Sequence, residues 1–172
     1  MPQLPLTGPG DDLPPRPDRP IYTPPGGPPG NTSVSKQIHA HMGDDNIRAM
    51  ISDFYDRLVA SPVAHLFPQD PERLAEAKDR SASFFIFLLG GPPLYQQKYG
   101  PPMMRARHMP FQIDEAARTA WLACFDAVLD EAPERYGFPP EHLPGFRDFL
   151  HKFSAWMVNT APPGDASDGG DP

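Results

Sequence analysis

The chain of 172 residues contains a single cysteine, Cys124. One cysteine excludes an intrachain disulfide, and it excludes a zinc or iron–sulfur site built from several cysteines of one chain. Positive charge is also scarce: 15 lysines and arginines stand against 22 aspartates and glutamates, which gives a net charge of −7. Such an acidic balance argues against nucleic acid and against an anionic membrane surface as partners.

Long apolar runs are missing as well. No stretch of the sequence is long and apolar enough to cross a bilayer. The N-terminus lacks the basic region and apolar run of a signal peptide. We therefore expect a cytoplasmic protein that uses no membrane.

Strand signals are absent, because no alternating run of β-branched residues has a useful length. Four stretches instead show the three- and four-residue apolar spacing of amphipathic helices. We predict helices over 44–60, from Asp70–Pro71 to the glycine pair at 90–91, over 114–132, and over 141–159. Asp44 or Asp45 would cap the first, and prolines 62 and 133 would follow the first and third. The expected fold class is all-α.

Proline is abundant, with 26 residues in the chain. Residues 1–35 form a proline-rich leader with few side chains that could bury themselves, and residues 162–172 form an acidic, glycine-rich tail. We expect both to be disordered, the leader partly as polyproline II. The folded domain is then predicted to span residues 36–161, which is enough for one hydrophobic core.

The segment 92–110 is long for so small a domain, and we predict it to be mostly non-helical. Its tyrosines and methionines argue against disorder, so something should pack beneath it, and a large apolar ligand would serve. This segment holds His108, which forms no metal-ligand spacing with the other five histidines. A haem needs only one protein ligand, and a lone histidine is compatible with it.

Several side chains have both a structural and a functional interpretation. Arg105 and Arg107 flank His108 and would pair with haem propionates, or they form a solvated basic turn. Tyr55 and Trp121 would donate hydrogen bonds to a diatomic ligand on iron, or they are core aromatics. The residues by themselves leave these alternatives open.

Four stretches occur in an order and spacing that closely resemble the truncated haemoglobins of group II. They read FYDRLVASPVAHLFP, LGGPPLYQQKYG, MRARHMPFQI and RTAWLACFDAVLD, and the resemblance covers about residues 44–160. It implies a truncated globin fold, a two-over-two helical sandwich around a haem b. It also implies His108 as the proximal iron ligand, with Tyr55 and Trp121 as the distal residues.

The resemblance assigns further site residues. Ala77 matches the position where longer globins keep a distal histidine, and Ser81 stands where this group often has a larger residue facing the ligand. Phe67 matches a position that packs on the haem face, and Arg80 and Arg107 match positions that commonly meet propionates. The predicted haem contacts are His108, Phe67, Arg80, Phe84, Arg107, Phe111 and Ile113, and the predicted ligand pocket contains Tyr55, Ala77, Ser81 and Trp121.

Three functions remain open at this stage. The first is a haem protein that binds O₂ reversibly, and also NO, CO or peroxide, with a detoxifying activity on NO or peroxide if a reductase supplies electrons. The second is a haem-based gas or redox sensor whose proline-rich leader docks a partner. The third is a haem-free helical interaction domain, in which His108, Tyr55 and Trp121 are ordinary packing residues.

Overall fold

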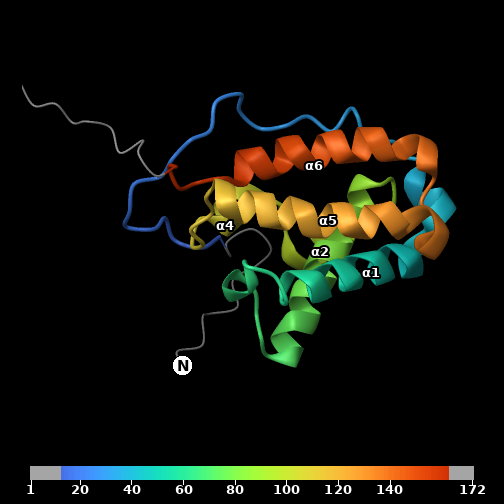
Figure 1. Cartoon of the computed structure of the whole chain (residues 1–172), viewed down its shortest axis with the longest axis horizontal. Coiled ribbons are helices and arrows are strands. Elements are labelled where there is room, and N and C mark those ends of the chain that lie inside the picture. Colours follow the sequence, from blue (N-terminus) through green and yellow to red (C-terminus); the bar gives the residue numbers. More distant parts are fainter. Residues whose placement is uncertain (1–12, 163–172) are drawn as a thin grey trace, which may run out of the picture.

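The structure, a computed structural model, describes residues 13–162 and contains only helices within that range (Figure 1). The all-α prediction is confirmed. The predictions made for residues 1–12 and 163–172 lie outside the described residues. The elements are α1 (Ile38–Leu58), η1 (Ala64–Leu66), α2 (Pro71–Leu88), α3 (Leu94–Tyr99), α4 (Met104–His108), α5 (Glu115–Tyr136), η2 (Pro140–His142) and α6 (Leu143–Met157).

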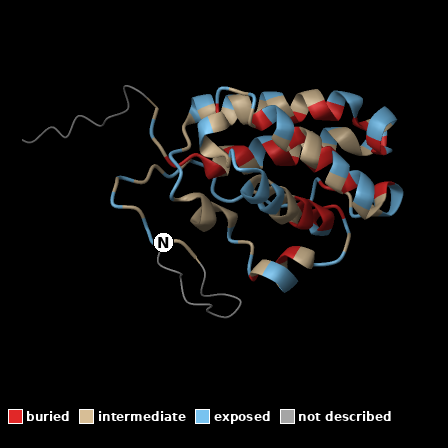
Figure 2. Ribbon diagram, turned by 90° about the horizontal axis from the view of Figure 1, so that it is seen from below, coloured by how far each residue is buried: buried red, intermediate tan, exposed pale blue. Residues whose placement is uncertain are grey.

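Four long helices make the two layers of the fold. Helix α1 packs against α2 and also against α5, and α5 packs against α6, so that one pair lies over the other (Figure 1). The inner faces of these helices are buried and the outer faces are exposed (Figure 2). Short α4 contacts α6, and α3 contacts α2. The segment that carries His108 is thereby attached to both layers.

Two of the long helices begin at aspartate caps, close to their predicted starts. Asp70 accepts a hydrogen bond from the Glu72 amide, with Pro71 at the first helical position. Asp114 accepts one from the Ala117 amide at 2.8 Å. These side chains satisfy amides that have no partner inside the helix, and this fixes where α2 and α5 start.

The start of α1 differs from the prediction. The helix begins at Ile38, and Gly43 interrupts it with a φ of +77°. Asp44 makes no cap there, because its carboxylate accepts a hydrogen bond from His39 Nε2 at 2.6 Å instead. The imidazole across the glycine kink competes with the backbone amides for this carboxylate.

The rest of the chain shows three further errors in the predicted secondary structure. Helix α5 continues through Pro133 to Tyr136, because buried Ala132 and Tyr136 anchor the last turn although proline removes one helical hydrogen bond. The segment 92–110 contains α3 and α4 and is therefore more helical than predicted. The fourth helix is shorter than predicted and ends at Met157, which leaves Asn159 outside it.

The described part of the leader, residues 13–35, lies against the helical body. Val34 is buried, and the Tyr22 amide donates to the Asn159 carbonyl at 2.9 Å. At Gly90, with a φ of +108°, an added Cβ would lie 1.8 Å from the Lys36 carbonyl oxygen. Only glycine therefore allows the chain after α2 to approach the segment that leads into α1. The leader was predicted to be disordered, whereas residues 13–35 make these contacts with the helical body.

Asp79 on α2 links three elements. Its carboxylate accepts hydrogen bonds from Arg48 on α1 and from Lys98 and Tyr99 on α3. Burial by itself would raise the pKa of Asp79, but these hydrogen bonds outweigh burial and hold the pKa below its usual value. The ionised Asp79 carboxylate therefore stabilises the fold fully above the unfolded-state pKa of an aspartate, about 4. This stabilisation is lost as the pH falls through the lower folded-state pKa of Asp79.

We expect Asp79→Asn to lower the free energy of unfolding by about 1 kcal/mol at pH 7, a value reduced for the partial exposure of the carboxylate. The difference from the wild type should begin to shrink as the pH falls below about 4, and it should vanish once the pH has passed the lowered folded-state pKa of Asp79, where both side chains are neutral. Urea unfolding of the variant and the wild type at a series of pH values measures the loss at pH 7 and its dependence on pH. A difference that stays constant down to pH 3 would contradict the role of the carboxylate charge.

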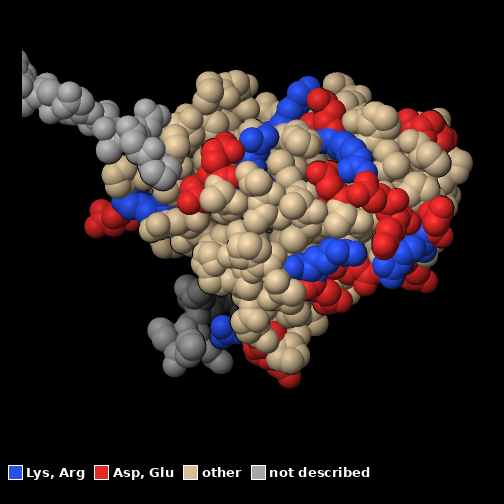
Figure 3. Space-filling model, viewed as in Figure 1, with Lys and Arg blue, Asp and Glu red and all other residues tan. Residues whose placement is uncertain are grey.

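The surface carries charges of both signs. Figure 3 shows arginines and lysines interspersed with aspartates and glutamates on the face that it displays. Within residues 13–162 no helix combines the length and apolarity that a membrane span requires.

Candidate functional site

A cavity of about 460 Å³ lies between the helices. Its volume falls within the range of about 300–1,000 Å³ that is usual for small-molecule and cofactor sites. Residues from α1, α2, α3, α4, α5 and α6 and from the connecting segments line it. The lining includes every predicted site residue: Tyr55, Phe67, Ala77, Arg80, Ser81, Phe84, Arg107, His108, Phe111, Ile113 and Trp121.

His108 is the last residue of α4. Its Nδ1–H donates to the Met104 carbonyl oxygen, one turn back in the same helix, at 2.6 Å. The carbonyl can only accept, so this bond assigns the proton to Nδ1 and leaves a lone pair on Nε2. Burial lowers the pKa of His108, and the hydrogen bond to Met104 only partly opposes this. The imidazole is therefore neutral at neutral pH.

No atom of residues 13–162 forms a hydrogen bond with Nε2 of His108. A neutral imidazole with its second nitrogen fixed by a backbone carbonyl is the usual form of a histidine ligand of a metal. The ring faces a cavity that is mostly apolar and large enough for a cofactor. The residues present therefore fit a haem with one axial histidine.

Three polar side chains reach the cavity from the long helices: Tyr55 on α1, Ser81 on α2 and Trp121 on α5. Burial raises the pKa of the Tyr55 phenol, and the nearby Ser81 hydroxyl offsets part of this rise. Tyr55 therefore keeps its proton at any physiological pH. Aromatic contacts hold the rings: the centroid of Tyr55 lies 5.6 Å from that of Phe67, and Trp121 packs edge-on against Phe54 at 5.4 Å.

The arginines predicted to meet propionates have protein partners in this structure. Arg80 pairs with Glu76 at 2.9 Å and stacks on the Tyr99 ring at 4.4 Å. Arg107 donates to the Pro102 and Tyr99 carbonyls, each at 2.9 Å. Both line the cavity, so their role as propionate partners stays a prediction. Arg105 is not among the lining residues.

Sequence reasoning missed other lining residues. Arg118 lies one turn before Trp121 on α5, and this spacing already placed it on the same face. Tyr95 was expected to help keep the segment 92–110 ordered, and neither Tyr95 nor Phe153 was assigned to the site. Pro14, from the leader, also lines the cavity, and no sequence signal pointed to it.

Comparison with known proteins agrees with this geometry. The family described as bacterial-like globin matches residues 38–157. The chain belongs to the bacterial-like globin family. Globins generally bind haem and, through it, diatomic gases such as O₂.

Relatives of this globin confirm its resemblance to the truncated haemoglobins of group II. It is 37% identical to the group 2 truncated hemoglobin YjbI of Bacillus subtilis over 89 residues, 52% of this chain and 66% of that protein. It is similar to phosphate-bound Hell's gate globin IV, with 35% identity, a TM-score of 0.70, and coverage of 76% and 79% of the two chains. It is also similar to the truncated oxygen-avid haemoglobin of B. subtilis, with 32% identity, a TM-score of 0.63, and coverage of 70% and 98%.

The match to the curated relatives is partial. The globin spans just under two thirds of the Bacillus YjbI protein and about a third of the Two-on-two hemoglobin-3 of Arabidopsis thaliana. The four long helices arranged two over two agree with these structures, and the predicted fold class is confirmed.

Proposed function

We propose that this globin holds haem b in the cavity through Nε2 of His108 and binds O₂ and other small diatomic ligands reversibly. One observation carries the proposal. A neutral imidazole with an unpaired Nε2 shares one mostly apolar cavity with two aromatic hydrogen-bond donors from other helices. The haem would supply the iron that binds the ligand.

The residues on the His108 side hold and tune the imidazole. The Met104 carbonyl orients the ring and keeps the proton on Nδ1. The neighbouring Phe111 ring lies 6.2 Å from the imidazole centroid. These contacts fix the direction of the Nε2 lone pair, because a hydrogen-bonded ring cannot turn freely.

On the other helices, Tyr55, Trp121 and Ser81 present O–H and N–H groups to the cavity. A diatomic ligand with partial negative charge would accept hydrogen bonds from them, each worth roughly 1.5–3 kcal/mol. Dissociation then requires those bonds to break, so release should be slow. A relative of this chain is described as oxygen-avid, which supports the same expectation.

Slow release suits chemistry on the ligand better than bulk delivery of oxygen. We therefore include oxidation of NO or reduction of peroxide in the proposal, with electrons from a reductase. The polar donors in an otherwise apolar cavity would stabilise negative charge on a departing oxygen.

A second candidate is a gas or redox sensor whose leader docks a partner. One observation favours it: leader residue Arg19 donates to the Met109 and Phe111 carbonyls, directly after His108. Changes at the haem would thereby reach the leader. Excess free peptide of residues 1–35, added to the intact protein, separates the candidates, because it would displace the partner from a sensor and abolish the partner response, whereas an enzyme would keep its turnover.

The test of the proposal is the visible spectrum of the purified full chain after haem reconstitution. We expect a Soret band in the ferric form, and shifts of that band on reduction and on addition of carbon monoxide. The protein should take up one haem per chain. Absence of a Soret band after reconstitution would leave only the haem-free interaction domain.

A further inference from the structure

The segment that follows His108 is held by a buried residue beyond the last helix. Asn159 is wholly buried, and its side chain spans this segment. Its Nδ2 donates to the Phe111 carbonyl at 2.9 Å and to the His108 carbonyl at 3.3 Å. Its Oδ1 accepts from the Ile113 amide at 3.0 Å, and its own amide donates to the Ile113 carbonyl at 2.9 Å. One side chain thus fixes the backbone of His108 and of the five residues after it.

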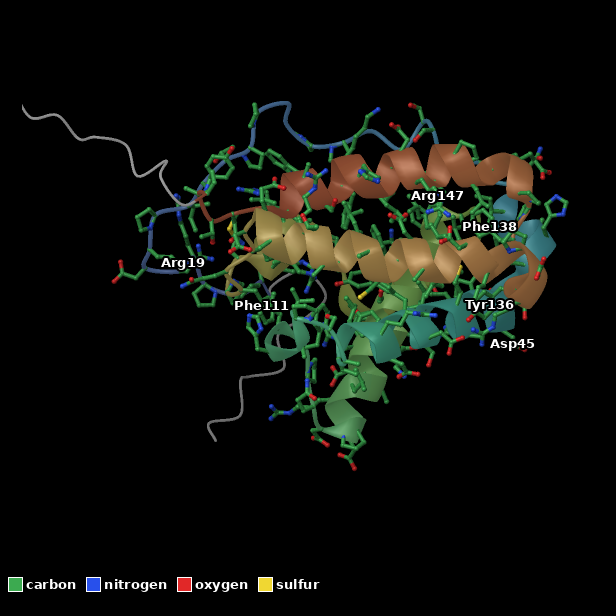
Figure 4. The ribbon with its side chains drawn as sticks, in the orientation of Figure 1. Arg19, Asp45, Phe111, Tyr136, Phe138 and Arg147 are labelled. Atoms are coloured by element: carbon green, nitrogen blue, oxygen red, sulfur yellow. The ribbon has the colours of Figure 1, made fainter. Side chains whose placement is uncertain are left out.

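The leader reaches the same place from the opposite end of the chain. Arg19 donates from one guanidinium nitrogen to the Met109 carbonyl at 2.8 Å and to the Phe111 carbonyl at 3.0 Å. The same nitrogen lies 3.3 Å from Oδ1 of Asn159. Figure 4 shows Arg19 and Phe111 at the same end of the molecule, away from Tyr136 and Phe138.

Helix α4 is itself bonded to the leader and to the segment after α6, in both cases through Arg105. Arg105 donates to the Tyr22 carbonyl at 2.7 Å and to the Val158 carbonyl at 2.9 Å. Its guanidinium lies over the Trp156 ring, 4.6 Å from the centroid. The leader, the end of α6 and α4 therefore form one hydrogen-bonded unit around His108.

The other side-chain hydrogen bonds of α4 to the rest of the chain come from Arg107, which donates to carbonyls of the preceding segment, at residues 99, 101 and 102. Helix α4 has five residues, and each of them is only partly covered. A helix this short is marginal on its own, so its position depends on tertiary contacts. The position of His108, at the end of α4, depends on the same contacts.

We propose that Arg19 and Asn159 are positioning residues for His108, and we call this pair the proximal clamp. The inference rests on the proposed function, since it concerns the geometry between Nε2 and the haem iron. The leader is then a working part of the haem site. Loss of the clamp would allow α4 to shift, which would move Nε2 of His108 relative to a bound haem and speed haem loss.

The test compares Arg19→Ala with Arg16→Ala in the full-length, haem-loaded protein. Arg16 lies three residues earlier in the same leader, and the structure describes no hydrogen bond of its side chain within residues 13–162. Resonance Raman of the ferrous protein gives the iron–histidine stretching frequency, and transfer to apomyoglobin gives the rate of haem loss. We expect Arg19→Ala to shift the frequency and raise the rate roughly tenfold, and Arg16→Ala to change neither.

Two further variants make the result specific. Arg19→Lys keeps the charge and one donor group, and we expect it to restore part of the wild-type frequency. Asn159→Asp keeps the acceptor for Ile113 and removes the donor to His108, and it should shift the frequency in the same direction as Arg19→Ala. A shift with unchanged thermal unfolding of Arg19→Ala distinguishes positioning from general stability.

The outcomes separate the two proposals. If the wild type binds haem but the iron–histidine frequency and the haem-loss rate of Arg19→Ala equal those of Arg16→Ala, the clamp is wrong and the proposed function stands. If the wild type takes up no haem, the proposed function itself is wrong.

Discussion

Replacement of His108 by alanine should leave a folded helical protein that no longer retains haem. His108 is the single predicted axial ligand, and loss of residues that merely support a metal ligand already costs 10–100-fold in affinity. We expect haem affinity to fall by more than ~100-fold. The ratio of haem to protein after purification, together with titration of the apoprotein with haemin, measures the change.

The matched control is His151→Ala, which removes an exposed imidazole from α6. This variant should bind haem like the wild type. Added imidazole should restore part of the spectrum of His108→Ala, because a free ligand can enter the space left by the side chain. Unchanged haem content and an unchanged spectrum in His108→Ala would refute the assignment of the proximal ligand.

Sequence patterns predicted the long helices because those helices carry their own signals. The apolar stripes predicted for α1 and α6 match their buried faces, and Asp70 and Asp114 cap α2 and α5. The stripe predicted for α2 lies mostly on the side that lines the cavity, with Ala77, Ser81 and Phe84. The structure and the comparisons also confirm the two-over-two arrangement, which the resemblance to group II truncated haemoglobins implied. Local sequence signals were sufficient to predict the long helices, and the family resemblance was sufficient to predict their arrangement.

The features that were missed depend on distant parts of the chain. Helices α3 and α4 are too short to show a period, so tertiary contacts decide whether they form. Pro133 looked like a helix end because its cost is local, whereas the burial of Tyr136 that offsets it is tertiary. Asn159 was predicted to be the last residue of a helix, and Arg19 stands in the leader that was predicted to be disordered.

The site shows the same division. The resemblance named eleven residues, and one cavity brings all of them together, although their roles remain to be tested. The partners of these residues were not predictable. Arg107 binds backbone carbonyls at 101, 102 and 99, and a sequence gives no signal for a bond to a carbonyl. Residue type indicated what the cavity could bind, whereas the hydrogen bonds that hold its walls required the structure.

Tyr55→Phe removes one hydroxyl from the cavity and keeps the ring that packs on Phe54 and Phe67. A hydrogen bond to a partly charged ligand is worth roughly 1.5–3 kcal/mol, which corresponds to about 10–100-fold in a dissociation rate. Ser81 and Trp121 remain as donors, so we expect O₂ to dissociate about tenfold faster. Stopped-flow displacement of O₂ by carbon monoxide measures the rate.

Tyr136→Phe is the control for Tyr55→Phe. It also removes a phenol hydroxyl, which here bonds to Asp53 near the end of α5 that lies away from α4 (Figure 4). It should cost some stability and leave the O₂ dissociation rate unchanged. An equal rate in Tyr55→Phe and the wild type would exclude Tyr55 as a donor. If Ser81→Ala in that background then speeds release, the Ser81 hydroxyl, which lines the same cavity, is a donor.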